Sequence, residues 1–433
     1  MRIREISVRN YKSLQHVTVR PRSLNVLVGP NDSGKSNFAD FLDFVADVYQ
    51  DGLSNAVARK GGFDAIAFQD RSSRSDAIEF TIKAELVYLG VEYERPRTRA
   101  RLRYRHRLTL KRAEDGARGE YWVTEERLTI HLANRGASPS PLVKVRRSGG
   151  QIRSRVFSRN HQFGKELKSI SQILAVASRG LDARQTNSLV VALSSLVSML
   201  GVFTESAARV RVFQFSPISA RQPGAAVHVP KLDRYGANLP TVVDLLQREH
   251  PRDWEKVLEA MRRIKPNLEE IKVGYTEARL LGLFFRETGY ERAWNAAEVS
   301  DGTIQSLALL TAIYDPEPGL LVLEEPENSV HPWIVRNIVE ACRSVGKRKQ
   351  IILTTHSPVL LDAVKPSEVW MIWRNGDGSS HVEPFGRVEP GFEELWRAGR
   401  LSISEFLDSG ALQSYVPSGV RHSDPEVDDG EAD

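Results

Sequence analysis

The sequence predicts an α/β fold whose core is divided into two segments by a large insertion. A glycine-rich loop at 29–36 follows a short apolar strand and precedes a segment with apolar residues at helical spacing. A second apolar run ends in consecutive acids at 324–325. Almost three hundred residues separate the loop from the second run. We therefore expect other structural units to be inserted between two halves of one site.

The loop 29–36 has the sequence Gly-Pro-Asn-Asp-Ser-Gly-Lys-Ser and the spacing of a phosphate-binding loop. Its two glycines let backbone amides point toward phosphates, and the N-terminus of the following helix favours an anion. We expect Lys35 to reach the terminal phosphates and the Ser36 hydroxyl to bind Mg²⁺. A chance match in a glycine turn is disfavoured by the fitting strand and helix. The other residues predicted to contact the nucleotide are Asn31, Ser33, Gly34 and Asn37.

The apolar run 320–323 ends in Glu324 and Glu325, where a buried parallel strand would deliver its acids to the ligand crevice. Glu324 is expected to hold the water shell of Mg²⁺, and Glu325 to orient and deprotonate the attacking water. The alternative, a solvated acidic turn, is disfavoured by the phosphate loop elsewhere in the chain. The pair of motifs predicts a site that binds and hydrolyses ATP.

Two further motifs indicate which kind of ATPase this is. Ser300 stands before a helix as a natural N-cap, and Gly302 lets the backbone approach an anion closely. A strand at 350–355 ends before His356, whose neutral imidazole could hydrogen-bond the γ-phosphate and couple its presence to a conformational change. Each motif alone is weak evidence, and their order along the chain carries the argument.

That order resembles the ABC-type ATPases of the RecF/SMC/OLD group, and most of all the stand-alone predicted ATPases found beside nucleases in bacterial anti-phage systems. The stretches 6–14 and 232–239 also fit, so the resemblance covers most of residues 1–375. It implies an ABC-type (RecF/OLD-like) P-loop ATPase with a split core, an inserted antiparallel β subdomain and a helical lobe. It also implies that 300–303 is the signature motif and His356 the switch histidine.

The same resemblance suggests other assignments and exposes two departures. His331 falls in the position of the D-loop, and Gln69 is a candidate for the glutamine that senses Mg²⁺, although a plain surface glutamine is the open alternative. Glu324 stands where the family usually has Asp. Asp32 stands where Gly is more frequent, and an acid so near the phosphates would weaken nucleotide binding unless it points outward.

Composition predicts a cytoplasmic protein without membrane contact. The single cysteine, Cys342, suits a reducing compartment, and the N-terminus lacks the apolar run of a signal peptide. Residues 185–204 carry no charge, but polar residues dilute them and leucines recur at helical spacing, so we expect a buried or interface helix. The net charge of +5 includes an acidic end at 421–433 with a net charge of −5. A basic body suggests a polyanionic partner.

The chain is expected to contain five regions. They are a first ATPase segment at 1–75, an antiparallel β subdomain at 76–159, a helical lobe at 160–297, a second ATPase segment with C-terminal helices at 298–415, and a disordered acidic tail at 416–433.

The β region contains arginine at every second position from 95 to 107. In a strand these side chains would line one face about 6.6 Å apart, close to the spacing of phosphates along a nucleic-acid strand. The alternative is a solvated face paired with acids such as Glu92, Glu94, Glu120, Glu125 and Glu126. We favour a face that contacts phosphates because the arginines outnumber these acids.

The leading functional hypothesis is an ATP-dependent homodimer, or higher homo-oligomer, that recognises nucleic acid, with DNA favoured over RNA. About sixty residues follow Trp373, too few for the nuclease domain of the family's larger members, so a nuclease or other effector would be a separate chain. Anti-phage defence or DNA repair would be the setting. The alternative is a protein-binding regulatory switch, in which the arginines serve protein contacts only. A transporter ATPase is disfavoured by the long insertion.

Overall fold

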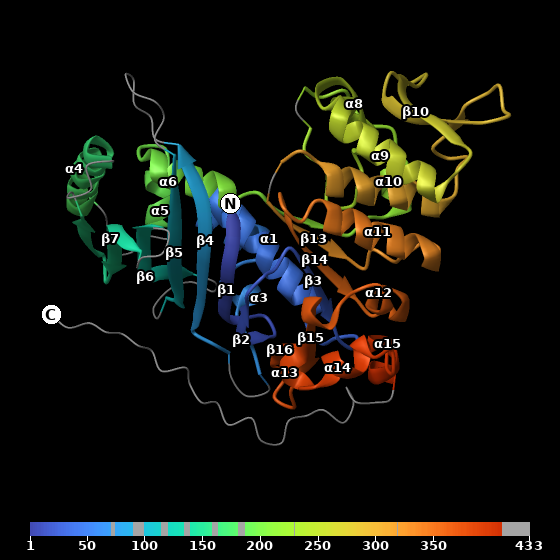
Figure 1. Cartoon of the computed structure of the whole chain (residues 1–433). Helices are drawn as coiled ribbons and strands as arrows, with labels where there is room; N and C mark the ends of the chain where they lie inside the picture. The colour runs from blue at the N-terminus through green and yellow to red at the C-terminus, as the bar shows by residue number, and fades with distance from the viewer. Residues whose placement is uncertain are drawn as a thin grey trace.

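The computed structural model describes residues 1–70, 74–89, 99–113, 120–133, 139–157, 163–180, 187–228, 230–317 and 319–408. Within them, two large sheets enclose one long helix, and a second group of helices covers the far side of one sheet (Figure 1). The predicted acidic tail at 416–433 lies outside the described residues.

The core sheet has six strands in the order β16-β15-β3-β14-β13-β9. β16 alone runs antiparallel, and the other five strands are mutually parallel. Every residue of β3, β13 and β14 is buried, as expected for parallel strands covered on both faces. The three predicted apolar strands are therefore confirmed. The strands are β3 (Leu24–Val28), β9 (Val210–Phe213), β13 (Leu320–Glu324), β14 (Gln350–Thr355), β15 (Val369–Arg374) and β16 (Ser380–Pro384).

The second sheet has seven antiparallel strands in the order β2-β1-β4-β5-β6-β7-β8. The alternating pattern beyond residue 76 correctly indicated its middle, but β1 and β2 come from the predicted first ATPase segment, so the boundary placed at 75 falls within this sheet. The strands are β1 (Arg2–Tyr11), β2 (Leu14–Val19), β4 (Ala77–Leu89), β5 (Arg99–Arg112), β6 (Tyr121–Leu132), β7 (Ser140–Ser148) and β8 (Gln151–Val156).

Helix α1 (Lys35–Asp51) lies between the two sheets (Figure 1). Phe38, Phe41 and Val48 on it are almost wholly buried, in a cluster that joins the antiparallel sheet to one face of the core sheet. The helix predicted after the phosphate loop is thus confirmed. Two short helices follow it, α2 (Leu53–Arg59) and α3 (Phe63–Ile66).

A second apolar cluster covers the opposite face of the core sheet. Its helices are α7 (Pro217–Ala220), α8 (Leu239–Glu249), α9 (Pro251–Ile264), α10 (Asp301–Tyr314), α11 (Pro332–Ser344) and α12 (Pro358–Asp362). A small sheet of β10 (Leu268–Tyr275), β11 (Leu281–Glu287) and β12 (Trp294–Asn295) flanks them. The region predicted as a helical lobe at 160–297 is therefore mixed, because it also supplies β9 to the core sheet. After β14 and β15 come η2 (Pro366–Glu368), α13 (Phe385–Val388), α14 (Phe392–Arg397) and α15 (Ile403–Phe406).

The uncharged stretch 185–204 forms two short helices where the sequence predicted one. α5 (Leu189–Leu193) and α6 (Ser198–Ala207) are separated by a turn, which leaves Leu196 63% exposed, whereas Leu189, Leu193 and Leu200 are buried. With α4 (Gly164–Gly180), they contribute to the cluster on the inner face of the antiparallel sheet. Among the described residues, no helix combines the length and apolarity needed to cross a membrane.

A buried polar network fastens α5 to this sheet. The Glu126 carboxylate on β6 accepts hydrogen bonds from the Ser188 hydroxyl and from the backbone N–H groups of Leu189 and Val190. His106 links Glu126 to the hydroxyl of Tyr49 on α1. Because these donors stabilise the charged form, the pKa of the buried Glu126 carboxyl lies below its usual value even though burial itself acts to raise it. The carboxylate thus caps α5 in place of an exposed acid.

Phe203 on α6 should contribute strongly to stability. Its ring is fully buried, stacks on Tyr104 with centroids 4.8 Å apart, and contacts Tyr49 edge-on. We expect Phe203→Ala to lower the free energy of unfolding by about 3–5 kcal/mol, measured by chemical denaturation. Ile218→Ala, at a 73% exposed position, is the control and should change stability little. An equal effect of the two substitutions would contradict this view of the core.

Candidate nucleotide site

The carboxyl ends of the parallel strands bring the predicted motifs to one edge of the core sheet. β14 pairs with β3 on one side and β13 on the other, so the phosphate loop, Glu324 and His356 follow neighbouring strands. Ligands of open α/β sheets bind at this edge. The structure therefore places together residues that are far apart in the sequence.

The geometry of the phosphate loop requires its glycines. A Cβ atom at Gly29 would lie 2.0 Å from the carbonyl oxygen of Ile372, and one at Gly34 would lie 2.2 Å from Ser380 Oγ. Gly34 also has a φ of 106°, in the left-handed region. Asn37 supports the loop from behind, since its Nδ2 donates to Ser13 Oγ at 2.7 Å.

The N-terminus of α1 is free to receive an anion. No side chain caps it, and no acid stands in its first turn. Ser33 Oγ is buried beside it without a hydrogen-bond partner. The Lys35 ammonium lies 2.8 and 2.9 Å from the carbonyl oxygens of Gly29 and Pro30. Burial lowers the pKa of Lys35, against the opposing charges of Glu325 and Glu327. These features fit a bound polyphosphate.

Asp32, the acid that departs from the family's loop, points outward. Its side chain is 86% exposed and pairs with Arg374 at the end of β15. The ion pair offsets its charge, so the repulsion expected for an acid near the phosphates is reduced. Asn31 is likewise exposed at the rim of the loop.

Ser36 and Glu324 lie close enough to share a metal ion, because the serine hydroxyl hydrogen-bonds the Glu324 carboxylate. Burial raises the pKa of Glu324, and the nearby Arg234 guanidinium opposes the rise. Among the described residues, no group of three or more His, Cys, Asp or Glu side chains could hold a metal by itself. A hydroxyl and one carboxylate instead suit Mg²⁺ that is bound together with phosphates.

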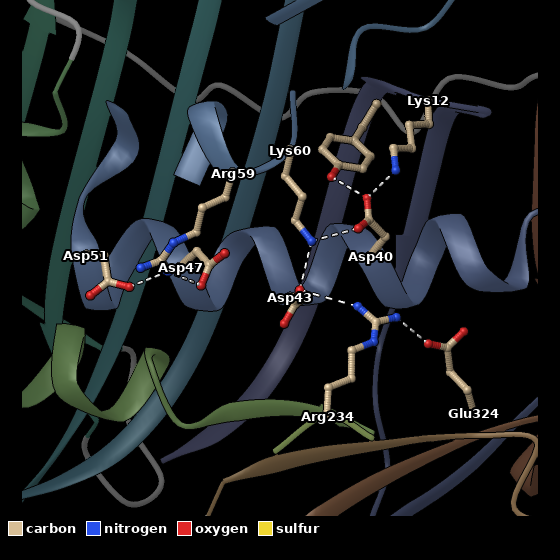
Figure 2. Close-up of polar contacts among 10 residues, drawn as sticks. Lys12, Asp40, Asp43, Asp47, Asp51, Arg59, Lys60, Arg234 and Glu324 are labelled. Carbon is tan, nitrogen blue, oxygen red and sulfur yellow. Dashed lines mark hydrogen bonds and ion pairs between the residues drawn. The ribbon is translucent and has the colours of Figure 1, made fainter. Parts of the chain in front are cut away.

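Arg234 is a residue of this site that sequence reasoning did not single out. Its guanidinium lies 2.7 Å from Glu324 Oε1 and 3.5 Å from Asp43 Oδ2 on α1 (Figure 2). Backbone hydrogen bonds hold its segment across the end of β9, from Gln214 N to Arg234 O and from Ser216 N to Tyr235 O. The stretch 232–239 was noted for its resemblance to the family, which was the available signal.

The same face of α1 carries further ion pairs. Asp40 contacts Lys12, Lys60 and the Tyr11 hydroxyl, and Lys60 also pairs with Asp43 (Figure 2). Burial and these neighbouring carboxylates raise the pKa of Tyr11, so its hydroxyl remains a donor. The network fixes the helix that begins at the phosphate loop.

Glu325 and His356 meet at the predicted catalytic position. His356 Nδ1 lies 3.6 Å from Glu325 Oε1, and Asn328 Nδ2 donates to Glu325 Oε2 at 2.9 Å. Glu325 has a φ of 45°, an uncommon value for a side-chain-bearing residue and one that recurs at functional sites. The next acid, Glu327, accepts a hydrogen bond from the Thr355 hydroxyl, and burial raises its pKa. The acidic loop is thereby joined to the strand that ends in His356.

The predicted signature motif begins α10, and Ser300 is its N-cap, as expected, because its side chain accepts a hydrogen bond from Thr303 N. Arg221 pairs with Asp301 and donates to the Val299 carbonyl. A Cβ atom at Gly302 would lie 3.1 Å from the Ser329 carbonyl oxygen. The motif thus packs against the chain's own 325–331 loop, in which His331 caps α11 and is exposed.

The assignment of Gln69 to Mg²⁺ sensing stays a prediction. Gln69 is exposed, and its Oε1 accepts a hydrogen bond from Arg74. Gln214 occupies a position that suits the role better, because Phe213 pairs with Leu323 and so places Gln214 level with Glu324 at the sheet edge. Its signal is its place after β9, which is recognisable only once β9 is known to join the core sheet.

Solved structures and a sequence family agree with this site. The head domain of an SMC protein bound to the C-winged helix domain of ScpA matches with a TM-score of 0.50 and 13% identity, over 88% of this chain and 98% of that one. An Smc head from Pyrococcus furiosus with an extended coiled coil matches over 91% and 99%, at 14% identity and a TM-score of 0.46. No curated protein matches the sequence. The fold and site define an ABC-type P-loop ATPase domain of the RecF/SMC kind.

The family itself is also shown. A sequence model described as "AAA domain, putative AbiEii toxin, Type IV TA system" matches residues 24–362. This range includes the phosphate loop, the signature motif and both catalytic candidates. The chain belongs to this family.

Lys35→Ala should abolish most ATP affinity while the fold survives. Hydrogen bonds to charged groups contribute about 1.5–3 kcal/mol, so we expect at least about a tenfold weaker dissociation constant, measured by titration with a fluorescent nucleotide. Lys347→Ala, at an exposed position, is the matched control. Binding by Lys35→Ala within twofold of the wild type would remove this loop from the site.

Proposed function

We propose that this protein is an ATPase that binds Mg²⁺–ATP between two copies of its chain and uses hydrolysis to control a second macromolecule. One observation carries the proposal. The phosphate loop, Glu324, Glu325 and His356 share one sheet edge, whereas the signature motif begins a different helix and contacts its own 325–331 loop. A second copy would supply the signature motif to complete the site.

Each residue has a distinct role in this proposal. ATP supplies a γ-phosphoryl group whose transfer to water requires charge stabilisation and an oriented nucleophile. Lys35 and the N-terminal amides of α1 stabilise the phosphate charge, and Ser36 with Glu324 would hold Mg²⁺. Glu325 accepts the proton of the attacking water. His356, within reach of Glu325, couples the site to the end of β14.

The controlled macromolecule is proposed to be nucleic acid, with DNA favoured over RNA, together with a separate effector such as a nuclease. The net charge of +5, the long arginine-rich strand β5 and the family's toxin description support this view. Anti-phage defence or DNA repair is the proposed setting. The alternative, an ATP-dependent switch that binds only protein, draws support from ion pairs that occupy several of the arginines, such as Arg107 with Glu79.

Glu325→Gln should separate binding from hydrolysis, because it removes the base and keeps the shape of the side chain. We expect normal ATP affinity, hydrolysis slowed at least ~100-fold, and accumulation of an ATP-dependent dimer or larger assembly. Phosphate release and light scattering with and without ATP measure these effects. Glu340→Gln, at an exposed position on α11, is the control. Normal turnover by Glu325→Gln would show that the acid is wrongly assigned.

Gly302→Asp should bind ATP but fail to dimerise and hydrolyse it, because a carboxylate would face the γ-phosphate held by the other copy. The tight approach of Ser329 to Gly302 calls for a comparison with Gly302→Ala, which adds the same Cβ without charge. We expect the alanine variant to retain more dimer, as measured by light scattering. Equal loss in both variants would attribute the defect to local crowding.

A further inference from the structure

The outer face of the antiparallel sheet carries two rows of cations that run across its strands. In β-sheets, directly opposed residues share a face, and the registers of β4–β8 therefore define the rows. The first row is Arg107, Arg127, Arg146 and Arg153. The second row contains Lys83, Arg105, Lys144 and Arg155, with Thr129 between the middle two. We call these two rows the basic face.

Acids compensate only part of this charge. Glu79 pairs with Arg107, Glu125 pairs with both Arg127 and Arg146, and Glu5 pairs with Lys83. The other acid on this side, Glu85, is shared by Arg101 and Arg103. The predicted partner Glu126 faces the core instead, and Glu92 and Glu94 lie outside the described residues, as do Arg95 and Arg97.

Four cations of the basic face, Arg105, Lys144, Arg153 and Arg155, have no acidic partner within the described part of the chain, and all four are exposed. Like charges directly opposite each other destabilise a sheet. Four arginines side by side in the first row therefore require an anion that the chain itself does not fully supply. Burial, with the positive charges of Lys144 and Arg103, also lowers the pKa of His131 on this side.

We propose that the basic face binds the phosphate backbone of duplex DNA without reading its sequence. Five strands about 4.8 Å apart cover about 19 Å, more than a major groove about 12 Å wide, so the rows can meet phosphates on both sides of a groove. Single-strand binders add aromatic stacking platforms. Among the described outward positions of β4–β8, the aromatic residue is Trp122, at one end of β6 opposite Lys111.

The inference deepens the proposed function, and it rests on that function only for control by ATP. The phosphate loop and Glu325 follow strands of the core sheet, whereas the basic face lies on the other sheet, on the side away from α1. DNA binding by the basic face should therefore be measurable without nucleotide. Its loss should leave ATP hydrolysis intact.

The test replaces Arg105, Lys144 and Arg153 with Gln together, because none of the three has an acidic partner to strand in the sheet. Binding of a labelled duplex of about three helical turns is followed by anisotropy between about 50 and 200 mM salt. We expect at least about tenfold weaker binding and a salt slope reduced by up to about 2.7, since each phosphate contact contributes up to about 0.9. Basal ATPase rate and thermal unfolding should match the wild type.

The matched control removes three exposed cations elsewhere, as Arg252→Gln, Lys347→Gln and Arg400→Gln, and should bind DNA as the wild type does. Equal weakening in both triple variants would reduce the effect to net charge and overturn the proposal. Tighter binding of single-stranded DNA, duplex RNA or polyglutamate than of duplex DNA would also overturn it, as would wild-type protein that binds no duplex at low salt. If Glu325→Gln with ATP leaves DNA binding unchanged while the basic face still matters, the ATP gate fails and the DNA surface stands.

Discussion

The burial of α1 between two sheets is the constraint on which the rest of the structure depends. Its apolar residues pack against both the antiparallel sheet and the core sheet, and its acids are held by Lys12, Lys60 and Arg234. A helix enclosed on both sides has little freedom to tilt or slide. The phosphate loop at its N-terminus therefore has a fixed position relative to the acids of β13.

The local motifs could be predicted because their chemistry lies in consecutive residues. Glycine spacing and a lysine define the phosphate loop, and an apolar run that ends in acids defines β13. Ser300 as an N-cap followed from one residue type before an apolar helix, and the structure bears it out. In each case the flanking segments already contain the physical reason for the structure.

The missed features depend on pairing between distant segments. β1 and β2 join strands beyond residue 76, and β9 joins the core sheet from within a region that otherwise reads as helical. Gln214 and Arg234 acquire meaning only from these pairings, whereas Gln69 was chosen from sequence position alone. The uncharged stretch at 185–204 shows the same limit, because the turn between α5 and α6 interrupts what composition alone presents as one apolar helix.

The contact between Arg234 and Glu324 means that the site carries its own counter-ion. A carboxylate at the end of a buried strand is costly to leave uncompensated, and the Glu324 side chain is only 4% exposed. The guanidinium neutralises it, so the folded chain tolerates this acid without any metal. A cation arriving with the nucleotide then enters a balanced site and shares Glu324 with Arg234. Since the arginine segment is bonded to the end of β9, the charge state of the metal site is tied to a strand almost a hundred residues away in the chain.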